Sequence, residues 1–384
     1  MIPSNITLIL TLSLLIWGSP FVAKFVRIPI PPVEIILGSI FAYIGLVSHN
    51  QYFDLIAEVG FLYLMFLAGM EVDLKQITKS PKNVIQKAIL FITFMSLFSI
   101  ALGMLFRLNT ITIISMPLIS IGLLASLTKT YGKDQPWIKL AFIAGVLGEI
   151  VSIAALTIFD AASTTGFNIA LIIKIGYLLF FIASVYMLYK LLNLLFWWFP
   201  ELKNILVPKL DTSDQDIRLA MALFFILIAV MLSLELELAL GAFIAGIAIS
   251  AFFHHEKKLG EKMSSLGFGF LVPIFFLHVG ASFDLKSLMV EGVVSGALLI
   301  TTLMILSRVL AAVVLKKISG SRDALLVALS LSMPLTLLVA VATIGYETKL
   351  LDLLSYYQLI LASIFEILIS MTVIKVLHSR RKED

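Results

Sequence analysis

The chain has 384 residues, of which 60% are hydrophobic and 14% are charged, and its mean hydropathy is +1.06. This composition exceeds what the core of a soluble protein needs and predicts an all-α polytopic membrane protein. The net charge of +4 lies mainly in short loops between apolar segments, so we exclude nucleic acid as a partner. The absence of cysteine excludes disulfides, thiolate metal sites and cysteine nucleophiles.

Thirteen apolar segments follow one another along the chain, and we predict that each is a transmembrane helix. They cover residues of about 5–25, 32–48, 54–72, 84–106, 111–131, 137–159, 166–197, 217–234, 237–253, 265–282, 288–315, 323–345 and 354–377. The connecting loops are short and the chain stops soon after the last segment. We therefore expect one transmembrane domain over residues 1–384 and no soluble C-terminal domain.

Basic residues alternate between the loops and predict the orientation. Loops after odd-numbered segments are rich in lysine and arginine, for example at Lys257 and Lys258, whereas those after even-numbered segments hold little beyond Arg107, Lys286 and Lys349. Basic loops stay on the cytoplasmic side. We therefore predict an N-terminus outside and a C-terminus inside, as in a multi-pass protein of the cytoplasmic (inner) membrane.

Segments that are seven apart share residues, which predicts an internal repeat. The matching stretches are 34–42 with 237–245 at an offset of 203, 69–75 with 280–286 at 211, and Glu149-Ile150 with Glu366-Ile367 at 217. Because seven is odd, the two copies are inverted: repeat one spans about 5–160, a linker helix 166–197 and repeat two 217–377. Inverted repeats are typical of secondary transporters with a substrate site near the bilayer midplane.

Three charged residues lie deep in these segments. Glu149 is near the centre of segment 6, Arg308 lies within segment 11 and Glu366 within segment 13. An ionisable group at such depth is costly and marks a functional site by default. We interpret Glu149 as a carboxylate that binds a proton and a cation alternately. Arg308 needs a permanent partner, and either Glu366 or Glu149 could serve; we favour Glu366.

The repeat also predicts two crossed, broken helices at the site. In segment 5 we expect the break between Ser126 and Gly132, where hydroxyl and β-branched residues such as Thr128 and Thr130 weaken the helix. In segment 12 we expect it around Ser332 and Pro334, because proline removes a backbone donor and frees a carbonyl. Hydroxyls and freed carbonyls are hard oxygen ligands for an alkali cation, so we include Ser332 among the ion-binding candidates.

The motifs FLAGMEVDL (66–74) and PPVEIILGSI (31–40), together with the buried acid of segment 6 and the basic residue of segment 11, resemble the cation:proton antiporter superfamily. The branch that the chain is similar to includes thirteen-helix bacterial sodium/proton antiporters and Kef-type potassium efflux systems. The resemblance covers essentially the whole chain. It implies a homodimer in which core helices, here about 84–159 and 288–377, move against the remaining dimerisation helices.

The resemblance also implies roles for single residues. Glu149 matches the cation- and proton-binding carboxylate, Arg308 the basic residue, and Ser126 and Thr128 a Ser/Thr pair of the first broken helix. Gly148 departs from the pattern, because relatives have Asp, Asn or Gln there, and Lys129 beside Thr128 is also unexpected. The missing second acid argues against a two-proton stoichiometry.

We therefore expect a secondary antiporter that exchanges Na⁺, with Li⁺ or K⁺ as further candidates, for H⁺ in electroneutral 1:1 exchange. A Na⁺-coupled organic-anion symporter, a Kef-like K⁺ efflux protein and a non-transporting sensor or channel-like derivative remain as alternatives. We find no phosphate-binding glycine loop, no His cluster with metal spacing and no nucleophile triad, so we expect neither an enzyme nor a cofactor. Expected partners are the transported ions, membrane lipids and a second copy of the chain. Selectivity among the alkali cations depends on cavity geometry that the sequence leaves open.

Overall fold

A computed structural model of the chain describes residues 4–26, 30–48, 50–70, 80–165, 169–198, 214–234, 238–252 and 257–379, and all regular secondary structure there is helical. The first half comprises α1 (Ser4–Val26), α2 (Ile30–Tyr43), α3 (Gln51–Met70), α5 (Lys82–Leu105), α6 (Thr110–Ser115), α7 (Gly122–Tyr131), α8 (Pro136–Thr165) and α9 (Ile169–Trp198). Residues 71–75 and Glu237, which entered the repeat comparison, lie outside the described residues.

The second half begins with α11 (Gln215–Ser233) and α12 (Leu238–Phe252). A continuous rod follows, made of α13 (Lys257–Leu266), the π-helical turn η1 (Gly267–Leu271) and α14 (Val272–Ala281). The chain then forms η2 (Leu285–Met289), α15 (Val293–Ala311), η3 (Ala312–Leu315), α16 (Lys316–Ser330), α17 (Leu335–Glu347) and α18 (Leu353–Ser379). Within the described residues, eight helices are long and apolar enough to cross a membrane.

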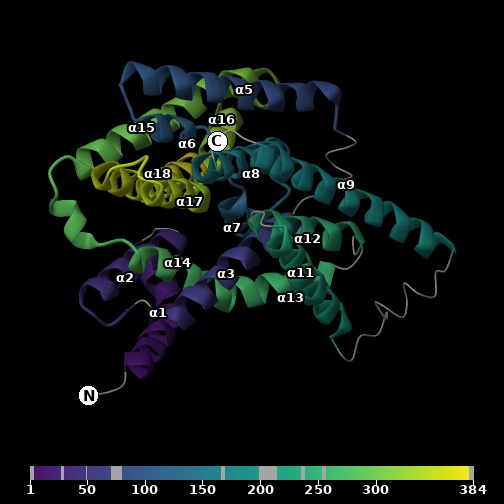
Figure 1. Cartoon of the computed structure of the whole chain (residues 1–384), viewed down its shortest axis with the longest axis horizontal. Coiled ribbons are helices and arrows are strands. Elements are labelled where there is room, and N and C mark those ends of the chain that lie inside the picture. The colour runs from purple at the N-terminus through teal and green to yellow at the C-terminus, as the bar shows by residue number, and fades with distance from the viewer. Residues whose placement is uncertain are drawn as a thin grey trace.

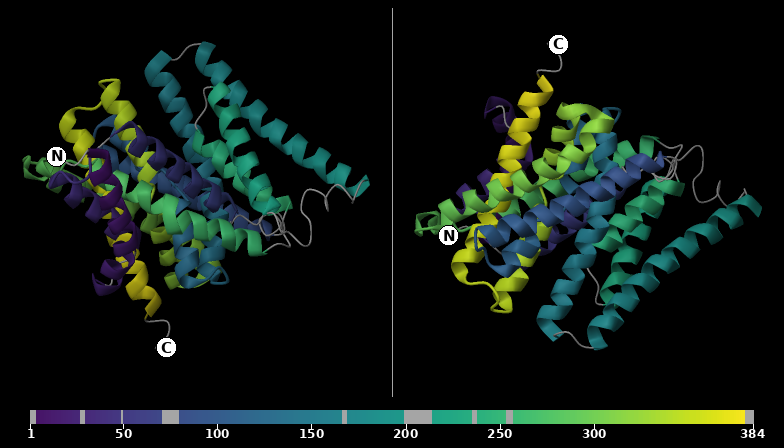
Figure 2. Two further views of the ribbon diagram at one scale, coloured as in Figure 1. Left: turned by 90° about the horizontal axis from the view of Figure 1, so that it is seen from below. Right: turned by 90° about the horizontal axis from the view of Figure 1, so that it is seen from above.

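The helices form two layers, seen one above the other in Figure 1. The upper layer contains α5–α8 and α15–α18, and the lower layer contains α1–α3 and α11–α14. α9 packs on α8 and runs toward the side of the molecule where α11 and α12 lie, as Figure 2 shows from two directions. Contacts between α3 and α7, and between α2 and α18, join the layers.

Glycines bring the helices of the lower layer into close contact. A Cβ on Gly69 of α3 would collide with the Phe243 carbonyl of α12, and one on Gly246 would collide with the Phe66 carbonyl. α2 and α14 show the same arrangement, where Gly280 faces the Ile35 carbonyl and Gly38 faces the Leu277 carbonyl. Glycine lets helix backbones approach this closely, as is common within membranes.

Two helices of the upper layer are interrupted. Residues 116–121 separate α6 from α7, and residues 331–334 separate α16 from α17. Pro117 and Pro334 lie in these gaps and account for them, because proline lacks an N–H group and disfavours helical geometry in the residue before it. α6 contacts α17 and α7 contacts α16, so the two interrupted helices cross.

Candidate functional site

Glu149 lies in α8 and is completely buried in the upper layer. The backbone N–H of Ile121, at the end of the unwound segment 116–121, donates to Glu149 Oε2 at 2.7 Å. The hydroxyl of Ser120 interacts with the same carboxylate. Glu149 Oε1 has no hydrogen-bond partner among the described residues. One oxygen of a fully buried carboxylate is therefore free to receive a proton or a cation.

Two glycines of α8 let the unwound segment 116–121 lie against this helix. A Cβ on Gly145 would collide with the side chain of Ile121, and a Cβ on Gly148 would collide with the side chain of Ile119. The space that a second acidic side chain would need at position 148 is thus filled by Ile119. The departure of Gly148 from the antiporter pattern has a packing reason.

Ser152, one turn after Glu149, also holds the unwound segment. The Ile119 backbone N–H donates to the Ser152 hydroxyl at 2.8 Å, and Ser152 is buried. Residues three apart lie on the same face of a helix. α8 therefore offers two side-chain acceptors to two alternate amides of this segment.

Arg308 of α15 is completely buried and links the unwound segment 116–121 to α18. Its Nη1 lies 3.0 Å from Glu366 Oε1 in α18 and donates to the Met304 carbonyl at 3.0 Å. Its Nη2 donates to the Leu118 carbonyl in the unwound segment 116–121 at 2.7 Å. The structure thus pairs Arg308 with Glu366, and its guanidinium neutralises that acid.

Ser332 is buried in the second gap and lies beside Glu366, not Glu149. Its hydroxyl makes no hydrogen bond of regular geometry within the described residues. Pro334 is the last residue before α17 and lies in the gap that the sequence predicted for segment 12.

The break predicted for segment 5 is misplaced. Ser126, Thr128 and Thr130 all lie within α7, and Gly132, with φ of +88°, is the residue that follows its end. The Thr128 hydroxyl donates to the Leu124 carbonyl at 2.9 Å, and the Thr130 hydroxyl donates to the Ser126 carbonyl at 3.0 Å. Hydroxyls that bond one turn back are compatible with a continuous helix. Within the described residues, no hydrogen bond joins Ser126 or Thr128 to Glu149.

A signal in the sequence could have located the true break. The tetrapeptide Ser-Met-Pro-Leu occurs at 115–118 and again at 332–335, and both copies fall at the gaps. The two copies are 217 positions apart, which is the separation of Glu149 and Glu366. Ser120, which sequence reasoning also missed, is in the first gap.

Lys129 of α7 contacts an aromatic ring of the lower layer. Its Nζ lies 5.0 Å from the centre of the Phe268 ring, which belongs to the π-helical turn η1 of the lower layer. A cation over an aromatic face is attracted by the electrons of the ring. The unexpected lysine therefore makes a contact between the layers.

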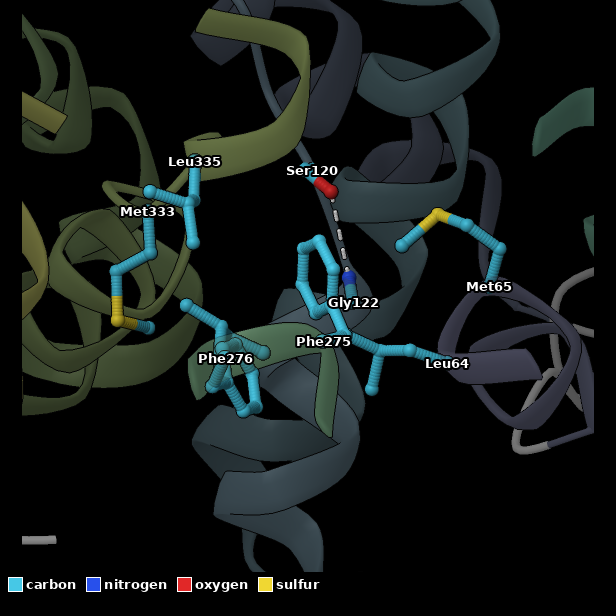
Figure 3. A pocket seen from close by; sticks show the side chains of 9 residues that line it. Leu64, Met65, Ser120, Gly122, Phe275, Phe276, Met333 and Leu335 are labelled. Atoms are coloured by element: carbon cyan, nitrogen blue, oxygen red, sulfur yellow. Dashed lines mark hydrogen bonds between the residues drawn. The ribbon is translucent and has the colours of Figure 1, made fainter. Parts of the chain in front are cut away.

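A small pocket lies between the layers (Figure 3). Its lining combines the unwound segments with α3, α7, α14 and α17, and consists of Leu64, Met65, Ser120, Gly122, Leu123, Phe275, Phe276, Met333 and Leu335. Ser120 contributes the one polar side chain of this lining and also contacts Glu149. The serine therefore connects the pocket with the buried carboxylate.

Comparison with known proteins gives consistent results. Residues 9–379 match the family described as "Sodium/hydrogen exchanger, transmembrane". The Na⁺/H⁺ antiporter of Enterococcus hirae is 25% identical over 354 residues, which cover 89% of each chain. YjbQ of Bacillus subtilis (strain 168) is 23% identical over 382 residues, which cover 93% of this chain but 60% of that protein. The chain thus spans about three fifths of the length of this relative.

The fold also matches that of a solved structure. The sodium proton antiporter MjNhaP1 from Methanocaldococcus jannaschii at pH 8 superposes with a TM-score of 0.67 over 96% of both chains, at 16% identity. The family match extends over nearly the whole chain, and the eight long apolar helices fit a multi-pass membrane protein. The chain belongs to the transmembrane sodium/hydrogen exchanger family, which is a family of transporters and not of enzymes.

Proposed function

We propose that the chain is a secondary antiporter that exchanges a monovalent cation for H⁺ by alternating access. The observation that carries this proposal is the Glu149 carboxylate, which is completely buried, has one oxygen without a partner among the described residues, and contacts a serine that lines a pocket. A buried carboxylate is costly unless a counter-charge or a proton neutralises it. A proton and a cation would therefore compete for Glu149.

We take Na⁺ as the main cation, with Li⁺ or K⁺ as further candidates. The name of the Enterococcus hirae relative specifies Na⁺/H⁺ exchange, and the family description specifies sodium. Carboxylate and hydroxyl oxygens, as on Glu149 and Ser120, are hard ligands that suit small alkali cations. Ser126, Thr128 and Ser332 remain sequence predictions as further ligands; within the described residues no hydrogen bond joins their hydroxyls to Glu149.

The exchange is proposed to be electroneutral, one cation for one proton. Arg308 holds Glu366 in an ion pair, which leaves Glu149 as the acid of the site that is free to be neutralised in turn. Ile119 fills the space where an acid at position 148 would lie. A single exchangeable carboxylate carries either one proton or one cation at a time, so the core crosses with the same net charge in both directions.

The proposed topology has thirteen membrane crossings in two inverted repeats, with the N-terminus outside and the C-terminus inside. Equivalent glycine contacts in the two halves support the repeat. Gly69 of α3 packs on α12, Gly280 of α14 packs on α2, and these two glycines are 211 positions apart. Gly38 and Gly246 form the second such pair at an offset of 208. The glycine packing therefore favours 208 over the offset of 203 that the sequence suggested for these helices.

The two layers suggest how access alternates. Leu64 and Met65 of α3 line one wall of the pocket, and Phe275 and Phe276 of α14, 211 positions later, line another. We propose that the upper layer is the transport core, which moves against the lower layer at this apolar contact when Glu149 is neutral. We further propose that the lower layer forms a homodimer interface within a cytoplasmic (inner) membrane, with lipid covering the remaining apolar faces.

Everted membrane vesicles with a pH-sensitive dye test the proposal. Addition of Na⁺ to vesicles with the wild-type chain should move protons, and Glu149→Gln should abolish this response. Glu34→Gln is a matched control: Glu34 is also buried, but lies in α2 and accepts a hydrogen bond from the Ser19 hydroxyl at 2.9 Å. The glutamine can keep that bond, so exchange should persist.

Two of the alternatives predict different results in the same vesicles. A Na⁺-coupled organic-anion symporter would take up anion with Na⁺ and show no cation-linked proton movement, which would refute antiport. A Kef-like protein would respond to K⁺ and not to Na⁺. Clamping the membrane potential at different values should leave the rate unchanged; a marked dependence on potential would refute 1:1 exchange.

A further inference from the structure

Three side chains fix the unwound segment 116–121 in place. Arg308 donates to the Leu118 carbonyl, Ser152 accepts from the Ile119 N–H and Glu149 accepts from the Ile121 N–H. Two of these three side chains are charged and belong to the ion-pair and ion-binding groups. Ser152 is the neutral one, and exchange of ions at Glu149 leaves its bonding capacity unchanged.

We propose that Ser152 is a positioning residue that holds the Ser120–Ile121 part of the cation site in its binding geometry throughout the transport cycle. This inference rests on the proposed function and deepens it. The bond between Ile121 and Glu149 must weaken whenever a proton or a cation takes up the negative charge of the carboxylate. The bond between Ile119 and Ser152 does not depend on that charge, so it retains the segment while Glu149 changes partners.

Ser152 affects the cation site through the backbone of the unwound segment 116–121. Ile119 is one residue before Ser120, whose hydroxyl contacts Glu149 and lines the pocket. The Ile119 side chain packs against Gly148, so the segment lies directly on α8 at this point. Without the Ser152 hydroxyl, a buried N–H would lose its acceptor and the segment would be less ordered before a cation binds. Part of the binding free energy would then be spent on ordering it.

Measurement of Na⁺/H⁺ exchange in everted vesicles against Na⁺ concentration tests this role. Ser152→Ala should raise the apparent KM for Na⁺ by roughly five- to thirtyfold, as expected when a buried donor loses its partner. Vmax should remain close to the wild-type value, because saturating Na⁺ orders the segment. Ser152→Thr keeps the hydroxyl and should restore the KM.

Ser363→Ala is the matched control. Ser363 is buried in α18, three residues before Glu366, but its hydroxyl donates to the Ile360 carbonyl of its own helix at 2.7 Å. Loss of this bond should leave the KM for Na⁺ unchanged. Ser152→Cys, which has a similar volume and a weak acceptor, should give an intermediate KM and supplies the test if the alanine variant does not accumulate in the membrane.

Specific results would overturn the inference. An unchanged KM in Ser152→Ala or Ser152→Cys would do so, as would a threonine variant that fails to restore the KM or an equal rise in Ser363→Ala. A fall in Vmax at constant KM would point to packing alone and would also overturn it. Failure of the wild-type chain to show Na⁺-linked proton movement is a different outcome, because it would refute the proposed function itself.

Discussion

The two deep glutamates should respond in opposite ways to the same substitution. Glu366→Gln removes the counter-charge of Arg308, which is completely buried and 3.0 Å from Glu366 Oε1. Removal of one partner of a buried ion pair costs about 3–5 kcal/mol of unfolding free energy, because the other charge stays buried. At about 2 °C per kcal/mol for a chain of this size, Tm should fall by roughly 6–10 °C.

Glu149→Gln should not cause such a loss. Its amide oxygen can still accept the Ile121 N–H, and the substitution removes a buried charge that has no opposite charge in contact with it. The Tm of the purified protein in detergent, measured by thermal unfolding at neutral pH, should therefore stay level or rise. Its exchange activity should nevertheless disappear.

A double variant separates charge pairing from hydrogen bonding. Replacement of both partners, as in Arg308→Met with Glu366→Leu, removes the uncompensated charge and should recover much of the stability lost by Glu366→Gln. Recovery should be incomplete by about 1–3 kcal/mol, since the Leu118 carbonyl also loses the Arg308 donor. Equal Tm values for wild type and Glu366→Gln, or an equal drop in Glu149→Gln, would refute the assignment of Glu366 as the structural acid and Glu149 as the exchanging one.

Three further predictions concern other parts of the site and fold. Gly148→Asp should lower the yield of folded protein, because the new side chain would collide with Ile119. Replacement of Ile119 by a smaller residue in the same variant should partly restore the yield. Full yield from Gly148→Asp alone would contradict this packing. Ser120→Ala should raise the KM for Na⁺ more than Thr128→Ala, because Thr128→Ala loses only a hydrogen bond within α7. Titration of vesicles with Na⁺ compares the two variants. The reverse order would favour the sequence prediction that Thr128 is a cation ligand. The hydrogen bonds from the side chain and backbone of Ser355 lower the pKa of Asp352 at the start of α18. The stabilisation that they give should therefore be complete at neutral pH and be lost as pH falls below the usual carboxyl range. Asp352→Ala should cost about 1 kcal/mol of unfolding free energy at pH 7 and little at pH 3, and thermal unfolding at both pH values checks this.

The sequence predicted the helical membrane fold and the burial of Glu149, because both depend on composition and on single residues in long apolar stretches. It misplaced the break in segment 5, since hydroxyl-rich stretches such as Ser126 to Thr130 remain helical when each hydroxyl bonds one turn back. Pro117 marks the true break, and proline is the stronger signal because it removes a backbone donor.

Contacts between distant helices set the remaining limits of the sequence reasoning. Glu34, near the start of α2, is buried like Glu149, Arg308 and Glu366. It is buried because α1 and α14 pack around α2. Nothing in the order of residues specifies that Ser19 would bond to it. The sequence also could not explain why position 148 carries glycine in place of an acid, because the reason is the side chain of Ile119, which fills the space beside Gly148.

The guanidinium of Arg308 has a mechanical consequence. It contacts the chain between α6 and α7 and also α18, so it ties the first interrupted helix to α15 and α18 within the upper layer. Movement of α18 away from α15 would have to separate the opposite charges of Glu366 and Arg308, both of which are completely buried. The contact between Met65 and Gly122 at the layer boundary is apolar, and no ion pair is found there within the described part of the chain. In the proposed alternating-access cycle, motion is therefore expected at the boundary between the layers, and the bound ion moves together with the upper layer.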